Sequence, residues 1–322
     1  MQGLVTVFGG SGFLGAQTVR ALAKRGYRVR VAVRRPGHGY RLRMLGDVGQ
    51  IEILQANIRA PISIARALDG AQACVNLVGA LYESGRQQFQ SLHAMGARNI
   101  AEAVAAAGVT RLIQVSAIGA DADSASKYAR TKAMGEAATR EVFPGTTILR
   151  PSIVFGRDDS FFNRFGQMAT LSPVLPLIGG GHTRFQPVFV GDVAAAVANA
   201  IGDPATAGQT YELGGPAIYT FKALMELILS ETGRQRILVP IPFALASLMG
   251  AAAELPSALL PIAPFLTRDQ VELLRTDNVV AAGALGLADL GIEPTAVEAI
   301  TPSYLFRYRK GGQYAEALAS GV

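Results

Sequence analysis

The chain has 322 residues, half of them hydrophobic, so it is long enough for one large domain or two interlocked ones around a sizeable core. The formal net charge of +6 is mild over this length, and there is neither zinc-finger spacing nor a long run of Lys or Arg, which argues against nucleic-acid binding. A single cysteine, Cys74, excludes a disulfide framework and lies in an apolar run, where a buried core thiol is expected. The short apolar run before the first glycines does not have the form of a signal peptide, and the default expectation is a cytoplasmic location.

The chain opens on an apolar, β-branched run at residues 4–8, which predicts a buried strand. A glycine-rich turn follows at once, and then Leu14, Thr18, Val19 and Leu22 recur at helical spacing. Strand, glycine turn and helix in this order are typical of a dinucleotide-binding fold, in which the helix N-terminus offers free N–H groups to the phosphates. A lone glycine pattern is a weak signal, and an ordinary strand-to-helix turn is the alternative.

Basic residues follow the second predicted strand, at residues 27–33, where Arg34 and Arg35 come next. An NAD site places an acidic residue about 20 positions past the glycines to hold the ribose 2′-hydroxyl. No Asp or Glu occurs here before Asp47. Arginine pairs with a 2′-phosphate through charge-assisted hydrogen bonds, so the site is predicted to prefer NADP(H). A basic surface loop is the alternative.

Strands and helices alternate up to about residue 155. Strands are expected at 4–8, 27–33, 51–54, 73–78, 111–116 and 147–149, and helices at about 62–68, 89–107 and 125–142, with a second strand–helix unit over 28–47. This alternation predicts the α/β class, as a Rossmann-type doubly wound parallel sheet.

The rhythm changes after residue 155. We assign 1–155 to the NADP-binding Rossmann domain, with 183–203 returning to it. The loop-rich residues 156–182 and the mixed short elements of 204–322 are assigned to a smaller C-terminal α+β domain for substrate binding or interaction. The ligand crevice is expected between the two parts, at the carboxyl ends of the strands.

The stretch from 237 to 266 contains one charged residue, Glu254, and is interrupted by prolines. Its proline-free piece at 243–255 is shorter than the roughly 20 residues of a spanning helix. Two interpretations stay open: the core of the smaller domain, or a hydrophobic surface for another protein or for the bilayer face. The basic segment 307–310 also has two possible interpretations. It contacts lipid headgroups or an acidic subunit, or it is a solvated tail.

Tyr128 and Lys132 lie four residues apart on a predicted helix and so share one face. A nearby ammonium favours the phenolate, which predicts a tyrosine able to exchange a proton near neutral pH. The lysine is also able to hold a ribose hydroxyl. This spacing is common by chance, but its position after the fifth predicted strand makes it specific.

The glycine turn, the Tyr-x-x-x-Lys spacing and Leu149-Arg150-Pro151 resemble the short-chain dehydrogenase/reductase superfamily, in its extended or atypical form. Segments 150–159, 186–193, 266–271 and 289–292 are similar to one branch, the nucleotide-binding accessory subunits of respiratory complex I (NADH:ubiquinone oxidoreductase). The resemblance covers nearly the whole chain. It implies a subunit that holds NADPH without turning it over in the main electron path, with complex I subunits as partners and peripheral contact at the inner face of the cytoplasmic membrane.

The resemblance also implies which residues contact the cofactor, position by position. The pyrophosphate falls to the glycine turn, the 2′-phosphate to the two arginines, adenine to the segment after the third strand, and the ribose units to the fourth strand end and the Tyr-Lys helix. The full set is Gly9, Ser11, Gly12, Phe13, Leu14, Gly15, Arg34, Arg35, Asn57, Ile58, Val78, Gly79, Ser116, Tyr128, Lys132, Pro151 and Ile153.

One departure bears on catalysis. Active relatives place a Ser or Thr after the fifth strand to hydrogen-bond the substrate carbonyl. The alignment puts Ala117 at this position and Ser116 one residue early, and a shift of one residue in an extended segment turns a side chain to the other face. With an alignment shifted by one, Ser116 would complete a catalytic set with Tyr128 and Lys132.

Three functions follow. The first is an NADP(H)-holding structural subunit or assembly factor of complex I. The second is an active NADP-dependent oxidoreductase acting on a carbonyl, sterol-like or quinone-related substrate. The third is a redox-sensing NADP-binding regulator. Fold alone does not decide among them.

Overall fold

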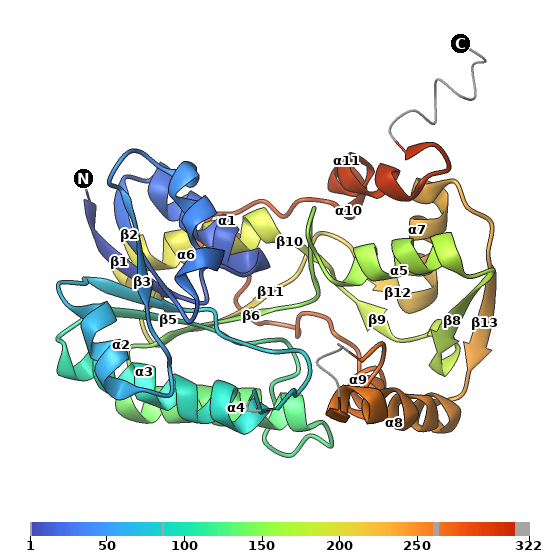
Figure 1. Ribbon diagram of the computed structural model, residues 1–322, viewed down its shortest axis with the longest axis horizontal. Coiled ribbons are helices and arrows are strands. Elements are labelled where there is room, and N and C mark those ends of the chain that lie inside the picture. The colour runs from blue at the N-terminus through green and yellow to red at the C-terminus, as the bar shows by residue number, and fades with distance from the viewer. Residues whose placement is uncertain (1, 86, 260–263, 313–322) are drawn as a thin grey trace, which may run out of the picture.

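Seven parallel strands form the central sheet of the computed structural model, which describes residues 2–85, 87–259 and 264–312 (Figure 1). The strand order is β11–β6–β5–β4–β1–β2–β3, so the direction of sheet growth reverses at β1, between β2 and β4. In an open α/β sheet, ligands bind at the carboxyl end of such a switch point. The strands are β1 (Gln2–Phe8), β2 (Tyr27–Val33), β3 (Ile51–Gln55), β4 (Ala73–Asn76), β5 (Arg111–Val115), β6 (Thr147–Pro151) and β11 (Thr210–Leu213).

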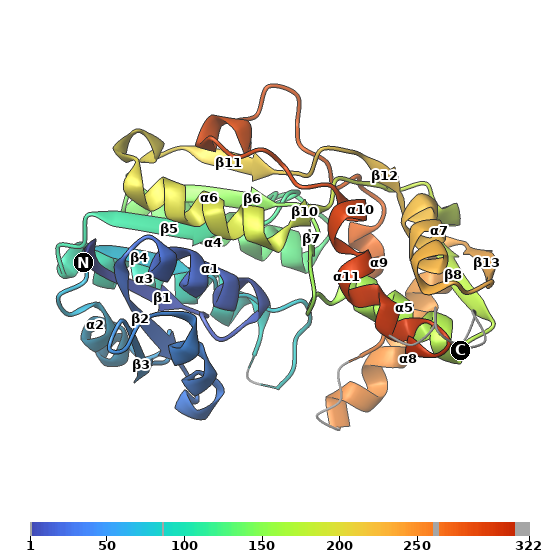
Figure 2. The same ribbon diagram turned by 90° about the horizontal axis from the view of Figure 1, so that it is seen from above.

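Helices cover both faces of this sheet (Figures 1 and 2). One face packs against α1 (Phe13–Lys24) and α6 (Val190–Gly202), the other against α2 (Pro61–Leu68), α3 (Met95–Ala106) and α4 (Lys127–Val142). Residues of β1 alternate between the two cores: Val5 and Val7 belong to the α1/α6 side and Phe8 to the α2/α3 side. The predicted α/β class and Rossmann-type sheet are confirmed, and Cys74 is a fully buried core thiol.

Three segments of this part differ from the sequence prediction. The second strand–helix unit contains two short 3₁₀ helices, η1 (Pro36–His38) and η2 (Tyr40–Leu45), in place of one α-helix. The helix expected at 89–107 begins as a π-helical turn, η3 (Gln90–Ala94), before α3. Residues 210–213 were assigned to the smaller domain, but they form the edge strand β11 beside β6, because Tyr211 and Leu213 are buried in the α1/α6 core. The central sheet therefore extends past the domain boundary that was predicted at residue 204.

Most of the remaining elements form what we call the small lobe (Figure 2). Its own aromatic core lies around Phe162, Phe221 and Tyr304. The segment expected to be loop-rich contains α5 because the buried Asp159 accepts hydrogen bonds from the backbone N–H groups of Phe162 and Asn163, at 2.7 and 3.3 Å. The lobe and its connections comprise β7 (Val154–Phe155), α5 (Phe161–Leu171), β8 (Val174–Ile178), η4 (Gly179–Gly181), β9 (Arg184–Phe185), β10 (Val188–Phe189), η5 (Pro204–Thr206), β12 (Tyr219–Thr220), α7 (Phe221–Thr232), β13 (Ile237–Ile241), α8 (Phe243–Leu259), α9 (Arg268–Leu273), η6 (Ala288–Leu290), α10 (Val297–Ile300), α11 (Pro302–Leu305) and η7 (Phe306–Tyr308).

The proline-interrupted stretch forms β13 and α8 and leaves much of its apolar surface open. Ala246 is buried, whereas Leu245, Leu248 and Met249 of α8 are 50%, 68% and 41% exposed. No helix within the described residues is long and apolar enough to span a bilayer. The stretch therefore does both: Ile241, Phe243 and Ala246 pack in a buried cluster of the small lobe, and another face of α8 is apolar and exposed.

The basic segment at 307–310 is not a free tail over its first residues. Arg307 Nε donates to the carbonyl of Tyr304 at 2.8 Å, and Arg309 Nε donates to the carbonyl of Glu231 at 2.7 Å. These two guanidinium groups hold the end of the described chain against the small lobe.

Candidate functional site

A cavity of about 240 Å³ lies where the carboxyl ends of β1, β2 and β4 meet. The turn after β1, the ends of β2 and β3 and the segment after β4 line it, as the switch-point rule predicts. Of the residues expected to contact a cofactor, eight line this cavity: Gly9, Ser11, Gly12, Arg34, Asn57, Ile58, Val78 and Gly79.

The glycine turn is shaped for a phosphate. Gly9 has φ +80°, a conformation that L side chains rarely adopt. A Cβ on Gly15 would lie 2.4 Å from the Gly9 carbonyl oxygen, so glycine is required for α1 to pack on the turn. Gly12 is the N-cap of α1 and supplies no side-chain cap, so the first N–H groups of the helix have no side-chain acceptor. A pyrophosphate fits this end of the cavity.

Arg34 supplies the positive charge at the far end of the cavity. Its Nη2 donates to Gln87 Oε1 at 3.0 Å, which ties the end of β2 to the segment after β4. Among the residues that the structure describes, no Asp or Glu lines the cavity. Both arginines are exposed, but Arg35 is the N-cap of η1 and only Arg34 lines the cavity, so the two arginines are not equivalent.

Tyr128 and Lys132 lie near the opposite edge of the cavity, on α4. Lys132 is buried and its Nζ lies 3.4 Å from the carbonyl oxygen of Val115 and 5.8 Å from the centroid of the Tyr128 ring. A Cβ placed on Gly79 would be 3.4 Å from this Nζ, so the ammonium faces the cavity wall. The helix thus brings the pair to the strand end where a nicotinamide ribose would lie.

The expected proton exchange by Tyr128 near neutral pH is not supported. Burial, with a smaller contribution from the Asp269 carboxylate, raises the pKa of Tyr128 to about 12. Burial also lowers the pKa of Lys132 to about 8 against the opposing charge of Glu136. Desolvation outweighs the ammonium effect that the sequence suggested, because both groups lie inside the protein.

Ser116 lies on the same side of the sheet as α3 and α4. Backbone bonds from Ser116 N to Leu149 O (2.7 Å) and from Ile118 N to Pro151 O (3.0 Å) continue the β5–β6 ladder past Val115. Alternation then puts Ser116 on the face of Leu112, which packs in the α2/α3 core, and Ala117 on the other. Ser116 Oγ is buried and has no hydrogen-bond partner within the described part of the chain. Buried hydroxyl groups normally have a hydrogen-bond partner. A bound group on this face of the sheet would supply one to Ser116 Oγ, as it would to the free N–H groups at the start of α1.

The remaining predicted contacts lie outside the cavity wall. The Phe13 ring approaches Gly156, with its Cζ 3.3 Å from where a Cβ on Gly156 would be, and Leu14 packs against the α1/α6 core. Pro151 belongs to β6, and Ile153 packs against the small-lobe core. The sequence did not predict Gln87 and Leu92, which close the cavity from the segment after β4; no motif marks them.

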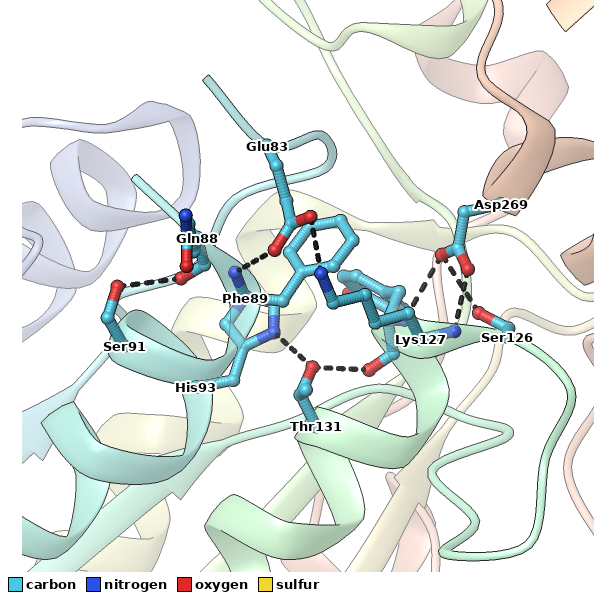
Figure 3. Close-up of polar contacts among 10 residues, drawn as sticks. Glu83, Gln88, Phe89, Ser91, His93, Ser126, Lys127, Thr131 and Asp269 are labelled. Carbon is cyan, nitrogen blue, oxygen red and sulfur yellow. Dashed lines mark hydrogen bonds and ion pairs between the residues drawn. The ribbon is translucent and has the colours of Figure 1, made fainter. Parts of the chain in front are cut away.

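The small lobe contacts α4 directly at the helix N-terminus (Figure 3). Asp269 of α9 accepts hydrogen bonds from the backbone N–H groups of Lys127 (2.6 Å) and Tyr128 (3.1 Å), and from Ser126 Oγ (2.9 Å). A carboxylate at this position satisfies unpaired N–H groups and the positive end of the helix dipole. The Asp269 contact therefore holds the Tyr128–Lys132 helix against the small lobe.

The doubly wound sheet, the uncapped glycine turn and the switch-point cavity define a Rossmann-type dinucleotide-binding protein. The pattern of the NAD dependent epimerase/dehydratase family matches residues 5–214, and the chain belongs to this family.

The relatives extend the similarity to the whole chain. The mitochondrial NADH dehydrogenase [ubiquinone] 1 alpha subcomplex subunit 9 of Arabidopsis thaliana is 36% identical over 96% of this chain and 79% of its own length. The Mus musculus protein of the same name is 36% identical over 95% of this chain and 80% of its own. An NADPH-dependent quinone oxidoreductase from Escherichia coli, solved with NADPH, matches with a TM-score of 0.73 at 21% identity, over 94% of this chain and 99% of its own.

These relatives confirm the family resemblance seen in the sequence and correct one expectation. The sequence suggested a cytoplasmic location, with peripheral contact at the inner face of the cytoplasmic membrane. The cytoplasmic location is wrong: the relatives that match nearly the whole chain are mitochondrial proteins by name.

Proposed function

We propose that this chain is an accessory subunit of respiratory complex I that holds NADP(H) structurally. The similarity to subunit 9 proteins over 95–96% of the chain, small lobe included, is the observation that carries the proposal. The cavity supports the binding of NADP(H), because the uncapped N-terminus of α1 lies at one end of the cavity and Arg34 lies at the other.

The choice of NADP(H) over NAD(H) rests on Arg34. Arg34 lines the cavity, and within the described part of the wall there is no carboxylate to accept a ribose 2′-hydroxyl bond. A 2′-phosphate would replace Gln87 as the partner of Arg34 or share the guanidinium with it. Bound NADPH supplies a hydride donor; Lys132 would hold its nicotinamide ribose, and Ser116 Oγ would gain a hydrogen-bond partner.

A structural role is favoured by the surroundings of Tyr128. Its ring is enclosed by Phe89 and His93, with centroids at 5.7 and 5.3 Å. The Asp269 contact holds the small lobe onto the helix that carries Tyr128. The ring contacts of Tyr128 and the Asp269 hydrogen bonds thus stabilise one arrangement of the small lobe against α4.

The decisive experiment isolates the protein with its partners from solubilised membranes and identifies the bound nucleotide in the same sample. We expect complex I subunits and NADPH together. Recovery of the chain alone, empty and indifferent to nicotinamide nucleotides by calorimetry, would contradict both halves of the proposal.

The exposed face of α8 is the surface we assign to a neighbouring subunit. Leu245, Leu248 and Met249 share one side of the helix, and residues 243–259 contain no Lys or Arg to attract anionic headgroups. The only charge of α8, Glu254, accepts a hydrogen bond from the backbone N–H of Arg268. An uncharged apolar stripe fits an apolar protein surface better than a charged bilayer surface.

Replacing Leu248 with Glu tests this assignment. We expect the variant to lose co-purification with the complex at least fivefold and to keep its NADPH affinity, because burying a charge in the interface is costly and the cofactor cavity is remote. Ile62→Glu is the matched control, since Ile62 is 89% exposed on α2. Equal loss in both variants, or vesicle binding that disappears only in Leu248→Glu, would refute a protein partner at this face.

The second candidate is an active NADP-dependent reductase of a carbonyl compound. It is favoured by Ser116, whose orphaned hydroxyl lies on the same sheet side as α4, with Tyr128 and Lys132. Under our proposal, the purified protein and its Tyr128→Phe variant oxidise NADPH equally slowly with a panel of carbonyl substrates. Turnover in the parent that Tyr128→Phe abolishes, in a variant that still binds NADPH, would establish the reductase instead.

A further inference from the structure

His93 occupies an unusual backbone segment between the cavity and the Tyr-Lys helix. It lies in the π-helical turn η3, and such turns occur mostly as local insertions at functional sites. Its side chain is 2% exposed. A Cβ on Gly135 of α4 would be 2.1 Å from the His93 carbonyl oxygen, so the two backbones are in direct contact. The imidazole is thus enclosed between the segment after β4 and α4.

The two hydrogen bonds of His93 determine its tautomer, and Figure 3 shows the one to Thr131. The backbone N–H of Ala80 donates to Nε2 at 3.1 Å, so Nε2 carries no proton. Nδ1 therefore carries the proton and donates to Thr131 Oγ1 at 3.1 Å, and Thr131 Oγ1 in turn donates to the carbonyl oxygen of Tyr128 at 3.0 Å. Burial and the charge of Lys132 lower the pKa of His93 to about 3, which keeps this neutral form over the physiological range.

The ring of His93 also supports Tyr128. Phe89 stacks on the imidazole with centroids 5.2 Å apart and planes inclined by 17°, and the Tyr128 ring meets the imidazole edge-on at 87°. Such edge-on contacts orient an aromatic ring as well as burying it. His93 therefore contacts the Tyr128 turn of α4 through both the ring and the hydrogen-bond chain.

We propose that His93 is a positioning residue that sets the distance between the ribose-binding turn at Gly79–Ala80 and the turn of α4 that carries Tyr128 and Lys132. One imidazole nitrogen holds the first turn and the other nitrogen holds the second, so the gap receiving the nicotinamide ribose has a fixed width. The inference rests on the proposed cofactor site. It adds a residue that touches neither the reactive ring nor the phosphates.

Calorimetry on the full-length protein tests this with two ligands, NADPH and adenosine 2′,5′-bisphosphate, which lacks the nicotinamide riboside. His93→Phe keeps the ring stack and removes both hydrogen bonds. We expect Kd for NADPH to rise about tenfold and Kd for the fragment to stay within about twofold, because only the nicotinamide end is mispositioned. Gln90→Ala, an exposed neighbour in the same π-helical turn, should change neither value.

Thr131→Val removes the hydroxyl that links His93 to the carbonyl oxygen of Tyr128. This variant tests the same hydrogen-bond network if His93→Phe does not fold. We expect a smaller loss of NADPH affinity, about threefold, and no further loss when it is combined with His93→Phe, because the two changes interrupt one network. Unchanged NADPH affinity in both variants, or parallel loss of NADPH and the fragment, would overturn the role of His93. A parent protein that binds neither ligand would instead overturn the proposed function.

Discussion

Arg34→Ala is expected to weaken NADPH binding by about 2 kcal/mol, roughly 30-fold in Kd, and to leave NADH binding within about twofold. The guanidinium lines the cavity and its present partner is the neutral oxygen of Gln87, which a phosphate would outcompete. NADH carries a hydroxyl where NADPH carries the phosphate, so it has no charge-assisted contact to lose. Titration calorimetry with both nucleotides measures the difference directly.

Arg35→Ala is the matched control for this variant. It removes the same charge one residue further on, from an exposed side chain that does not line the cavity. Its effect on NADPH should be at most about threefold, from the long-range field alone. Equal loss of both nucleotides in Arg34→Ala, or a larger loss in Arg35→Ala, would refute the assignment of the 2′-phosphate to Arg34.

Arg150→Met is expected to lower the free energy of unfolding by about 3 kcal/mol, the lower end of the cost of breaking a buried ion pair, because the Glu136 carboxylate keeps the Arg140 guanidinium, at 4.0 Å. Arg150 on β6 donates twice to Glu136 on α4, from Nε to Oε1 at 2.9 Å and from Nη2 to Oε2 at 2.7 Å. The side chain of Glu136 is only 3% exposed. This ion pair joins the sheet to the helix of Tyr128 and Lys132, so urea denaturation should report its loss as a lower midpoint.

Arg98→Met provides the comparison, because Arg98 pairs with Glu102 and Glu141 on the surface. The three side chains are 45%, 54% and 65% exposed, and ion pairs that are this exposed contribute little to stability. Glu136→Met combined with Arg150→Met should recover part of the stability lost by Arg150→Met alone, since the buried charge is removed. Similar destabilisation by Arg98→Met and Arg150→Met would mean that burial does not set the cost.

Local patterns predicted much of the nucleotide end of the site. The β1 strand, its glycine turn and α1 are contiguous in sequence, so hydrophobic spacing and the steric demands of glycine describe them without knowledge of the rest of the chain. The same holds for the parallel strands up to β6 and for the position of Arg34. Eight of the predicted contact residues consequently line one cavity.

Local sequence patterns did not predict the contacts between segments that are far apart along the chain. Gln87 meets Arg34 across 53 positions, and Asp269 meets the start of α4 across more than 140. The strand β11 was assigned to the smaller domain because its four residues do not show which sheet they join until they pair with β6. Rules that consider only neighbouring residues do not predict such pairings.

The sequence by itself therefore determined the fold class and the family, and it predicted the residues at the glycine-turn end of the cavity, because these depend on short motifs whose residues are neighbours along the chain. Only the tertiary structure decided the protonation states at the other end, where enclosure raises the pKa of Tyr128 and lowers those of Lys132 and His93. It also decided that α8 is exposed and that Arg35 stands apart from Arg34. The physical reason is desolvation: its free energy depends on what surrounds a group in space, which the order of residues does not specify.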